Sequence, residues 1–168
     1  MYNKKTKLLG MATLLSSFAA ANVCADIQIL GSESDISQSI SEHYQQSSQF
    51  YNDNLANNDA LYINVSTASD DDIAKAQTHI YQGDIVIIDL REIPGEDAKI
   101  QLSQSLTGLG SDSPLVVTGV YQGDKIINSI VADVRDENGQ PINNPPAEFE
   151  SLNQSLVHAL DRLGFGGE

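Results

Sequence analysis

The chain has little of several residue types. Its 168 residues include one cysteine and no tryptophan, and 9 Lys and Arg stand against 23 Asp and Glu, which gives a formal charge of −14. A single cysteine can form neither an internal disulfide nor a cysteine-rich metal site. So few basic residues also argue against nucleic acid and anionic membrane surfaces as main partners, because binding to phosphates needs a patch of Lys or Arg.

The N-terminal segment has the pattern of a secretory signal peptide. Three lysines precede an apolar stretch at residues 8–23, and small residues follow it. We predict that residues 1–25 are removed by cleavage between Ala25 and Asp26, with cleavage after Ala21 as the alternative. The apolar stretch is shorter than the roughly 20 residues that a membrane span requires. We therefore expect an exported protein, periplasmic or secreted, with no stable membrane anchor.

Cys24 suggests an alternative, in which a cysteine at the end of the apolar stretch carries a lipid. Val23 argues against it, since a small residue is expected directly before such a cysteine. Cleavage at Ala25 would remove Cys24 together with the three N-terminal lysines and no acidic residue, so the formal charge would change from −14 to −17. The mature chain would then lack cysteine in an oxidising compartment, which excludes thiol chemistry.

Residues 26–168 are predicted to form a single α/β domain, because this length is typical of one domain. Apolar periodicity and turn residues predict helices at 33–51, 69–82, 96–109 and 148–163, and strands at 60–65, 84–90, 114–121 and 125–134. This order, a helix, then βαβαββ, then a helix, favours a mixed four-stranded sheet with flanking N- and C-terminal helices.

Two architectures fit that order. In a two-layer sandwich, which we expect, all helices cover one face of the sheet. In a thioredoxin-like three-layer fold, they cover both faces. The apolar run Ile85–Ile88 is typical of a strand covered on both sides, and residues 113–125 resemble the proline-to-hairpin part of thioredoxins. Periodicity alone does not separate the two architectures.

No pattern of catalytic residues is present. His43, His79 and His158 fall on predicted helices, and the chain has neither a Gly-x-Ser-x-Gly elbow nor a His-x-x-x-His zinc motif. The acidic run Asp70–Asp72 is typical of a first helical turn, and residues 136–139 are typical of a turn rather than a complete calcium loop. We therefore expect no enzyme activity, no cofactor and no bound metal.

Several segments together resemble a known family. They are residues 35–38, Tyr51-Asn52, residues 85–90 with the acidic helix that follows, residues 115–124, and residues 160–165. In order and spacing, they are similar to the cytolysin secretion proteins of bacterial hemolysin operons and to the related N-terminal pro-domain of secreted pore-forming cytolysins. In the pro-toxins this domain resembles a chaperone carried in cis.

The resemblance implies a helper that acts in trans on a pore-forming cytolysin encoded nearby, since the chain ends at Glu168, where a pro-toxin would continue into its toxin body. Tyr44, Phe50 and Tyr51, or an open edge of the sheet, could supply the docking surface, although these aromatics are more often core residues. Two other functions stay open: a cysteine-free thioredoxin-like binding domain in the periplasm, and a small hydrolase that uses the three histidines.

Overall fold

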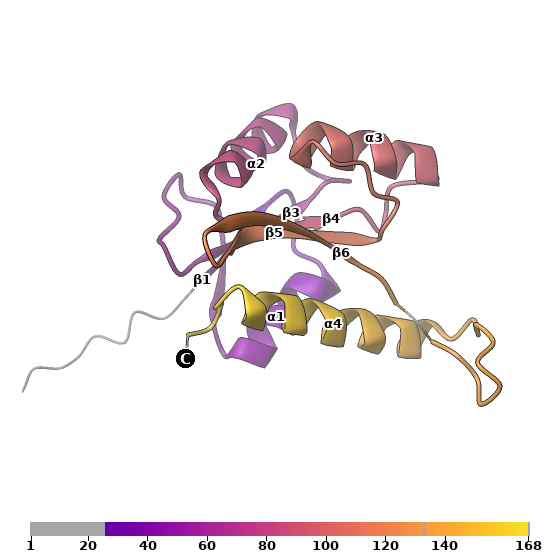
Figure 1. The fold of residues 1–168 in the computed structure, drawn as a ribbon. Coiled ribbons are helices and arrows are strands. Elements are labelled where there is room, and N and C mark those ends of the chain that lie inside the picture. Colours follow the sequence, from indigo (N-terminus) through magenta and orange to yellow (C-terminus); the bar gives the residue numbers. More distant parts are fainter. Residues whose placement is uncertain (1–25, 133, 168) are drawn as a thin grey trace, which may run out of the picture.

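The computed structural model describes residues 26–132 and 134–167, which form a mixed α/β fold (Figure 1). The predicted signal peptide, including Ala25, lies outside the described residues. The strands are β1 (Asp26–Leu30), β2 (Ser47–Phe50), β3 (Ala60–Asn64), β4 (Ile85–Asp89), β5 (Leu115–Tyr121) and β6 (Asp124–Ile130). The helices are α1 (Asp35–Tyr44), α2 (Asp70–Gln82), α3 (Glu96–Thr107) and α4 (Pro145–Arg162). The predicted α/β class is confirmed.

One sheet joins all six strands in the order β2-β1-β3-β4-β5-β6. The strands β2, β1, β3 and β4 are parallel, β5 pairs antiparallel with β4, and β6 pairs antiparallel with β5. A two-residue turn connects β5 and β6, with Gln122 at φ 53° and Gly123 at φ 91°. Both residues are left-handed, as this type of hairpin requires, and the predicted hairpin is confirmed.

The sheet has six strands rather than the predicted four, because β1 and β2 were not foreseen. The segment predicted as one helix over residues 33–51 holds only α1, which ends where Gln45 adopts a left-handed conformation with φ 53°. The chain then returns as β2, whose sequence Ser-Ser-Gln-Phe carries no strand signal of its own. Pairing with β1 along the whole strand holds this segment extended.

Helices cover both faces of the sheet: α1 and α4 lie on one side and α2 and α3 on the other (Figure 1). The expected two-layer sandwich is therefore wrong, and the layering is that of the three-layer alternative. The reason lies in the central strands. Every residue of β3 is buried, and its side chains alternate between the two faces, so each face needs its own cover.

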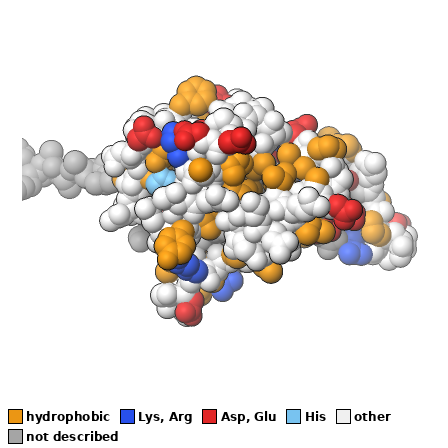
Figure 2. Space-filling view, turned by 90° about the horizontal axis from the view of Figure 1, so that it is seen from above, with side chains coloured by type: hydrophobic (Ala, Val, Ile, Leu, Met, Phe, Trp, Pro, Cys, Tyr) orange, Lys and Arg blue, Asp and Glu red, His pale blue; other side chains and the backbone are white. Residues whose placement is uncertain are grey.

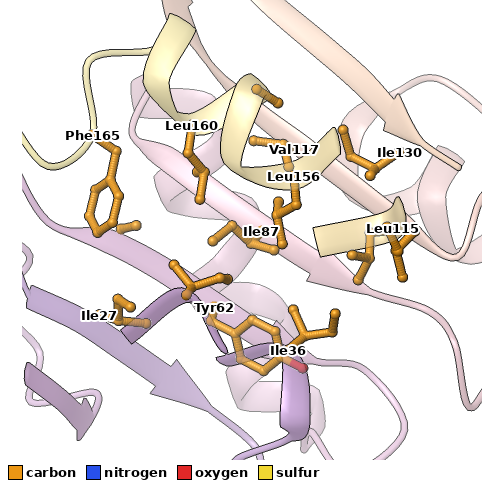
Figure 3. Packing of buried hydrophobic residues seen from close by; sticks show 14 of the residues in the cluster. Ile27, Ile36, Tyr62, Ile87, Leu115, Val117, Ile130, Leu156, Leu160 and Phe165 are labelled. Atoms are coloured by element: carbon orange, nitrogen blue, oxygen red, sulfur yellow. The ribbon is translucent and has the colours of Figure 1, made fainter. Parts of the chain in front are cut away.

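Two hydrophobic cores result. The core under α1 and α4 is drawn in Figure 3 and includes Ile27, Ile36, Tyr62, Ile87, Leu115, Val117, Leu156, Leu160 and Phe165. The core under α2 and α3 includes Leu30, Leu61, Ile63, Val86, Ile88, Leu106 and Val116. Helix α2 begins and ends as predicted, with Ser69 capping its N-terminus and Gly83 its C-terminus.

Candidate interaction surface

A groove lies between α2, α3 and the β5–β6 hairpin. Its volume is about 360 Å³, within the range of ~300–1,000 Å³ common for ligand sites. Ile80 of α2, Leu106 of α3 and Ile127 of β6 line it with apolar surface. Figure 2 views this side of the molecule and shows hydrophobic side chains gathered across the middle of the face. This face of the sheet is therefore incompletely covered where it approaches β6.

Two polar groups of the groove differ in what they contact. The Lys125 ammonium donates a hydrogen bond to the Tyr81 carbonyl oxygen and lies 4.7 Å from the centre of the Tyr81 ring. The hydroxyl of Thr118, a residue only 3% exposed, is buried and has no hydrogen-bond partner in the described part of the chain. An unpaired buried hydroxyl costs free energy, so Thr118 is a position at which the fold gives up stability.

A buried polar cluster lies at the carboxyl end of β4. The Tyr62 hydroxyl donates to Asp89 at 2.5 Å, and Arg91 donates to Asp89 at 2.8 Å and to Asp35 at 2.6 Å. Burial, and then the charge of Asp89, raise the pKa of Tyr62 above its ordinary value. The hydrogen bond from Arg91 lowers the pKa of Asp35. Because Arg91 bonds to both Asp89 of β4 and Asp35 of α1, the cluster ties α1 to the sheet.

The loops after β1 and β3 contact each other beside this cluster, and a pocket of about 420 Å³ lined by Gly31, Ser32 and Thr67 lies next to them. Ligands in open α/β sheets bind where neighbouring strands send their helices to opposite faces, which here is between the ends of β1 and β3. The Ser32 backbone N–H donates to Thr67 Oγ1 at 2.9 Å, and Asn64 Nδ2 donates to Ser32 Oγ at 3.2 Å. A Cβ on Gly31 would lie 2.8 Å from the Asn64 carbonyl oxygen. The two loops therefore pack directly on each other.

The three histidines are not brought together. His79 lies on α2, where its Nδ1 is 2.7 Å from Asp84 Oδ2 and its Nε2 is 2.8 Å from the Tyr51 hydroxyl. His43 and His158 line a separate pocket between α1 and α4, on the opposite face of the sheet. Neither of these two has a serine or carboxylate hydrogen-bond partner among the described residues. Among the described residues, no histidine ring is hydrogen-bonded to both a serine and a carboxylate.

The two acidic motifs have the local roles that the sequence predicted. In α2, Asp72 accepts a hydrogen bond from the Ser69 N–H while Ser69 caps the Asp72 N–H. In the loop after β6, Asp136 Oδ1 accepts from the backbone N–H groups of Asn138 and Gln140, both at 2.8 Å. Across residues 26–132 and 134–167, no three His, Cys, Asp or Glu side chains are placed to hold a metal ion.

Of the three aromatic residues considered for docking, Tyr44 and Tyr51 are packed against other side chains and Phe50 is exposed. Tyr44 contacts Phe165 edge to face and donates to Asp161 at 2.7 Å, and Tyr51 bonds to His79. Only Phe50 is largely exposed, at 67%. The expectation that all three lie on the first helix is wrong, because Phe50 belongs to β2 and Tyr51 follows it.

Asp26, the residue after the predicted cleavage site, is the first residue of β1. Its backbone N–H donates to Asp59 Oδ1 at 3.0 Å. The buried Asp59 carboxylate also accepts from Gln28 Nε2 and from the Ala56 N–H, each at 3.0 Å. These bonds fix the start of β1 against the loop before β3. None of the helices that the structure describes is both long and apolar enough to span a bilayer.

Sequence reasoning missed the groove, although it foresaw an open sheet edge. The groove combines residues from α2, α3, β5 and β6 that are up to 50 positions apart, such as Gln77 and Ile127. The available signal was the uncharged run Ile126–Ile130 at the end of a hairpin. That run predicted a strand, but it did not show which strand would lie at the edge.

Comparison with known proteins gives one informative match. No family model and no solved structure matches the chain. The chain is 54% identical to the cytolysin secretion protein of Vibrio vulnificus (strain CMCP6), over 168 residues that cover 100% of both chains.

Proposed function

The chain belongs to the cytolysin secretion protein family, and from that premise we propose that it assists the secretion of a pore-forming cytolysin by binding it directly, as a chaperone-like helper in trans. The observation that carries this proposal is the 54% identity along the entire chain. An identity of this size, over 100% of both chains, supports a shared role.

The charge of the chain supports a role in protein binding. A pore-forming toxin exposes apolar surface, and it must stay soluble until it reaches its target membrane. A helper with a formal charge of −14, or −17 after the expected cleavage, is itself soluble, is repelled by anionic lipid and attracts basic partners. The groove beside β6 offers apolar surface for the same contact.

We also propose that the protein acts by contact and not by catalysis. Two polar groups that are candidates for acid–base chemistry, His79 and Asp89, are occupied. Both ring nitrogens of His79 face partners, and the Asp89 carboxylate accepts from Tyr62 and Arg91. This arrangement supports a binding protein.

The proposed place of action is the periplasm or the medium. The basic and apolar pattern of residues 1–25 supports export. Intact mass measurement of the protein from a periplasmic extract should give the mass of residues 26–168. A mass that includes residues 1–25 would contradict cleavage.

Deletion of the gene tests the function. We expect the deletion strain to release much less haemolytic activity and less cytolysin protein into the medium, and a plasmid copy of the full chain to restore both. A copy that lacks residues 1–25 is the matched control, and it should not restore secretion if the helper acts after export. Unchanged extracellular cytolysin in the deletion strain would contradict the proposed function.

A further inference from the structure

The two edges of the sheet differ in how well they are protected against pairing. At one edge, β2 has four residues and pairs with β1 only. At the other edge, β6 has seven residues, and each pairs with one residue of β5 without a bulge. The pairing runs from the pair of Tyr121 with Asp124 to the pair of Leu115 with Ile130. Natural edges are usually short, bulged, or interrupted by charge or proline. In β6, the stretch Ile126–Ile130 has no charged residue and no proline.

The hairpin turn determines which backbone groups of β6 face outward. In a two-residue hairpin, the residues flanking the turn form a hydrogen-bonded pair, and such pairs then alternate with non-bonded ones. Counting from Asp124, the N–H groups of Lys125, Ile127 and Ser129 point away from β5. None of these three N–H groups has a hydrogen-bond partner within residues 26–132 and 134–167. They form a row of free donors along the edge.

The groove under α2 and α3 opens directly beside this row. Lys125, Ile126 and Ile127 of β6 line it together with Leu106 of α3. A strand added to β6 would point alternate side chains toward this face, where the apolar groove and the unpaired Thr118 hydroxyl lie. A free strand edge next to a groove for side chains is the arrangement by which proteins bind extended peptides.

We propose that β6 binds an extended segment of the partner cytolysin as a seventh strand of the sheet, an inference that rests on the proposed function. The segment should carry apolar, β-branched residues at alternate positions and Lys or Arg at its ends. Asp124 lies at one end of the edge. At the other end, Ser129 is bonded to Ser111, which directly precedes Asp112. Asp124, together with the formal charge of −14, favours Lys or Arg in the partner segment.

Charge also favours the cytolysin over a second copy of this chain. Two copies that pair through β6 would bring together two molecules with a formal charge of −14 each, which repel one another. The ammonium of Lys125 is already bonded to Tyr81 and offers little compensation. A basic partner segment is instead attracted by the negative charge of this chain.

Amide hydrogen exchange on the wild-type chain tests the proposal directly. The probe is the purified precursor of the pore-forming cytolysin made by the same organism. We expect its addition to slow exchange at Lys125, Ile127 and Ser129 by roughly tenfold or more, the size expected when free amides become hydrogen-bonded. The amides of β2 should not change, and they are the control within the same molecule.

A pair of substitutions at Ser129 isolates the backbone donor. Ser129→Pro removes the outward N–H, while Ser129→Ala loses the same hydroxyl and keeps the N–H. Proline is tolerated on edge strands where the N–H faces solvent. We expect Ser129→Pro to weaken cytolysin binding by about tenfold, and Ser129→Ala to change it by less than about twofold. Should Ser129→Pro not fold, Ile127→Pro against Ile127→Val repeats the comparison.

The outcomes separate the two proposals. Cytolysin binding with unchanged exchange at β6, and equal binding by Ser129→Pro and Ser129→Ala, would overturn the edge proposal and leave the helper function standing. Slow exchange at β6 that depends on protein concentration without cytolysin would also overturn it, because a second copy would then occupy the edge. No complex between the wild-type chain and the cytolysin would contradict the helper function itself, and the edge proposal with it.

Discussion

The two faces of the sheet are covered to different extents. Helix α4, with 18 residues, and α1 close one face, and Phe165 after α4 completes the core there. On the other face, α2 and α3 cover the parallel strands but leave a groove over β5 and β6. Helices therefore cover one face of the sheet completely, and the other face keeps a groove over β5 and β6. Stability is expected to depend mostly on the first face, and binding on the second.

The largest effect should come from core leucines on the two faces. Leu156→Ala, at a position with 0% exposure on α4, should lower the free energy of unfolding by about 3–5 kcal/mol. Leu106→Ala, at the groove, should cost only about 2 kcal/mol, because the site already opens to solvent. Urea unfolding of both variants measures the difference. Equal losses would contradict the comparison of the two faces.

A somewhat smaller effect is expected for the buried cluster at the end of β4. Asp89→Asn removes the charge that Tyr62 and Arg91 contact, and should lower the free energy of unfolding by about 2–3 kcal/mol. Thermal and urea unfolding check this value. Glu33→Gln, at a carboxylate without a hydrogen bond or ion pair in the described residues, is the control for the change of charge. A similar loss in both variants would show that the cluster stabilises nothing specific.

Thr118 should respond in the opposite direction. Thr118→Val removes a buried hydroxyl that has no partner in the described part of the chain, so the free energy of unfolding should rise by up to about 1 kcal/mol. Tyr62→Phe, which removes a buried hydroxyl bonded to Asp89, should instead lower it by about 1 kcal/mol or more. The two variants can be compared by urea unfolding. A loss of stability in Thr118→Val would show that the hydroxyl is satisfied, by water for example.

The smallest effect should be a pH dependence from Asp35. Its pKa is lowered from the ordinary value of 3.8, chiefly by the hydrogen bond from Arg91. A carboxyl group with a lowered pKa stabilises the fold above about pH 4, and this contribution is lost as the pH falls through the folded-state pKa. Because the Asp35 side chain is 60% exposed, we expect less than about 1 kcal/mol.

The variant Asp35→Asn should remove this part of the pH dependence. Urea unfolding at several pH values between about 2 and 6 should show a flatter stability profile for Asp35→Asn than for the wild-type chain. Glu33→Gln again serves as the control. A profile that is equally steep in Asp35→Asn would show that the contact with Arg91 does not survive in solution.

Elements with local signals could be predicted from the sequence, and elements that depend on pairing could not. The helix from Asp70 to Gln82 has a serine cap, acidic residues in its first turn and a glycine stop, all within 15 residues, and it forms as predicted. The strand β2 has no such signal, because its extended form comes from pairing with β1. The predicted long helix over residues 33–51 failed for that reason.

The candidate site was also predictable only where it depends on local sequence, and not where it depends on strand pairing. From the sequence we expected an acidic binding protein, with an open sheet edge as one possible docking surface. The sequence could not identify β6 as the open edge, because strand order depends on contacts among all six strands. The unpaired state of Thr118 likewise depends on which segments pack around β5, and these are distant in the sequence.

By itself, the sequence determined the family, the acidic charge and the positions of the elements with strong local patterns. These properties depend on residues close together in the chain, or on composition, so folding does not alter them. Only the tertiary structure decided that helices cover both faces, that β1 and β2 extend the sheet, and that β6 borders a groove. Those features arise from contacts between distant segments, and their free energies are not contained in any single stretch of sequence.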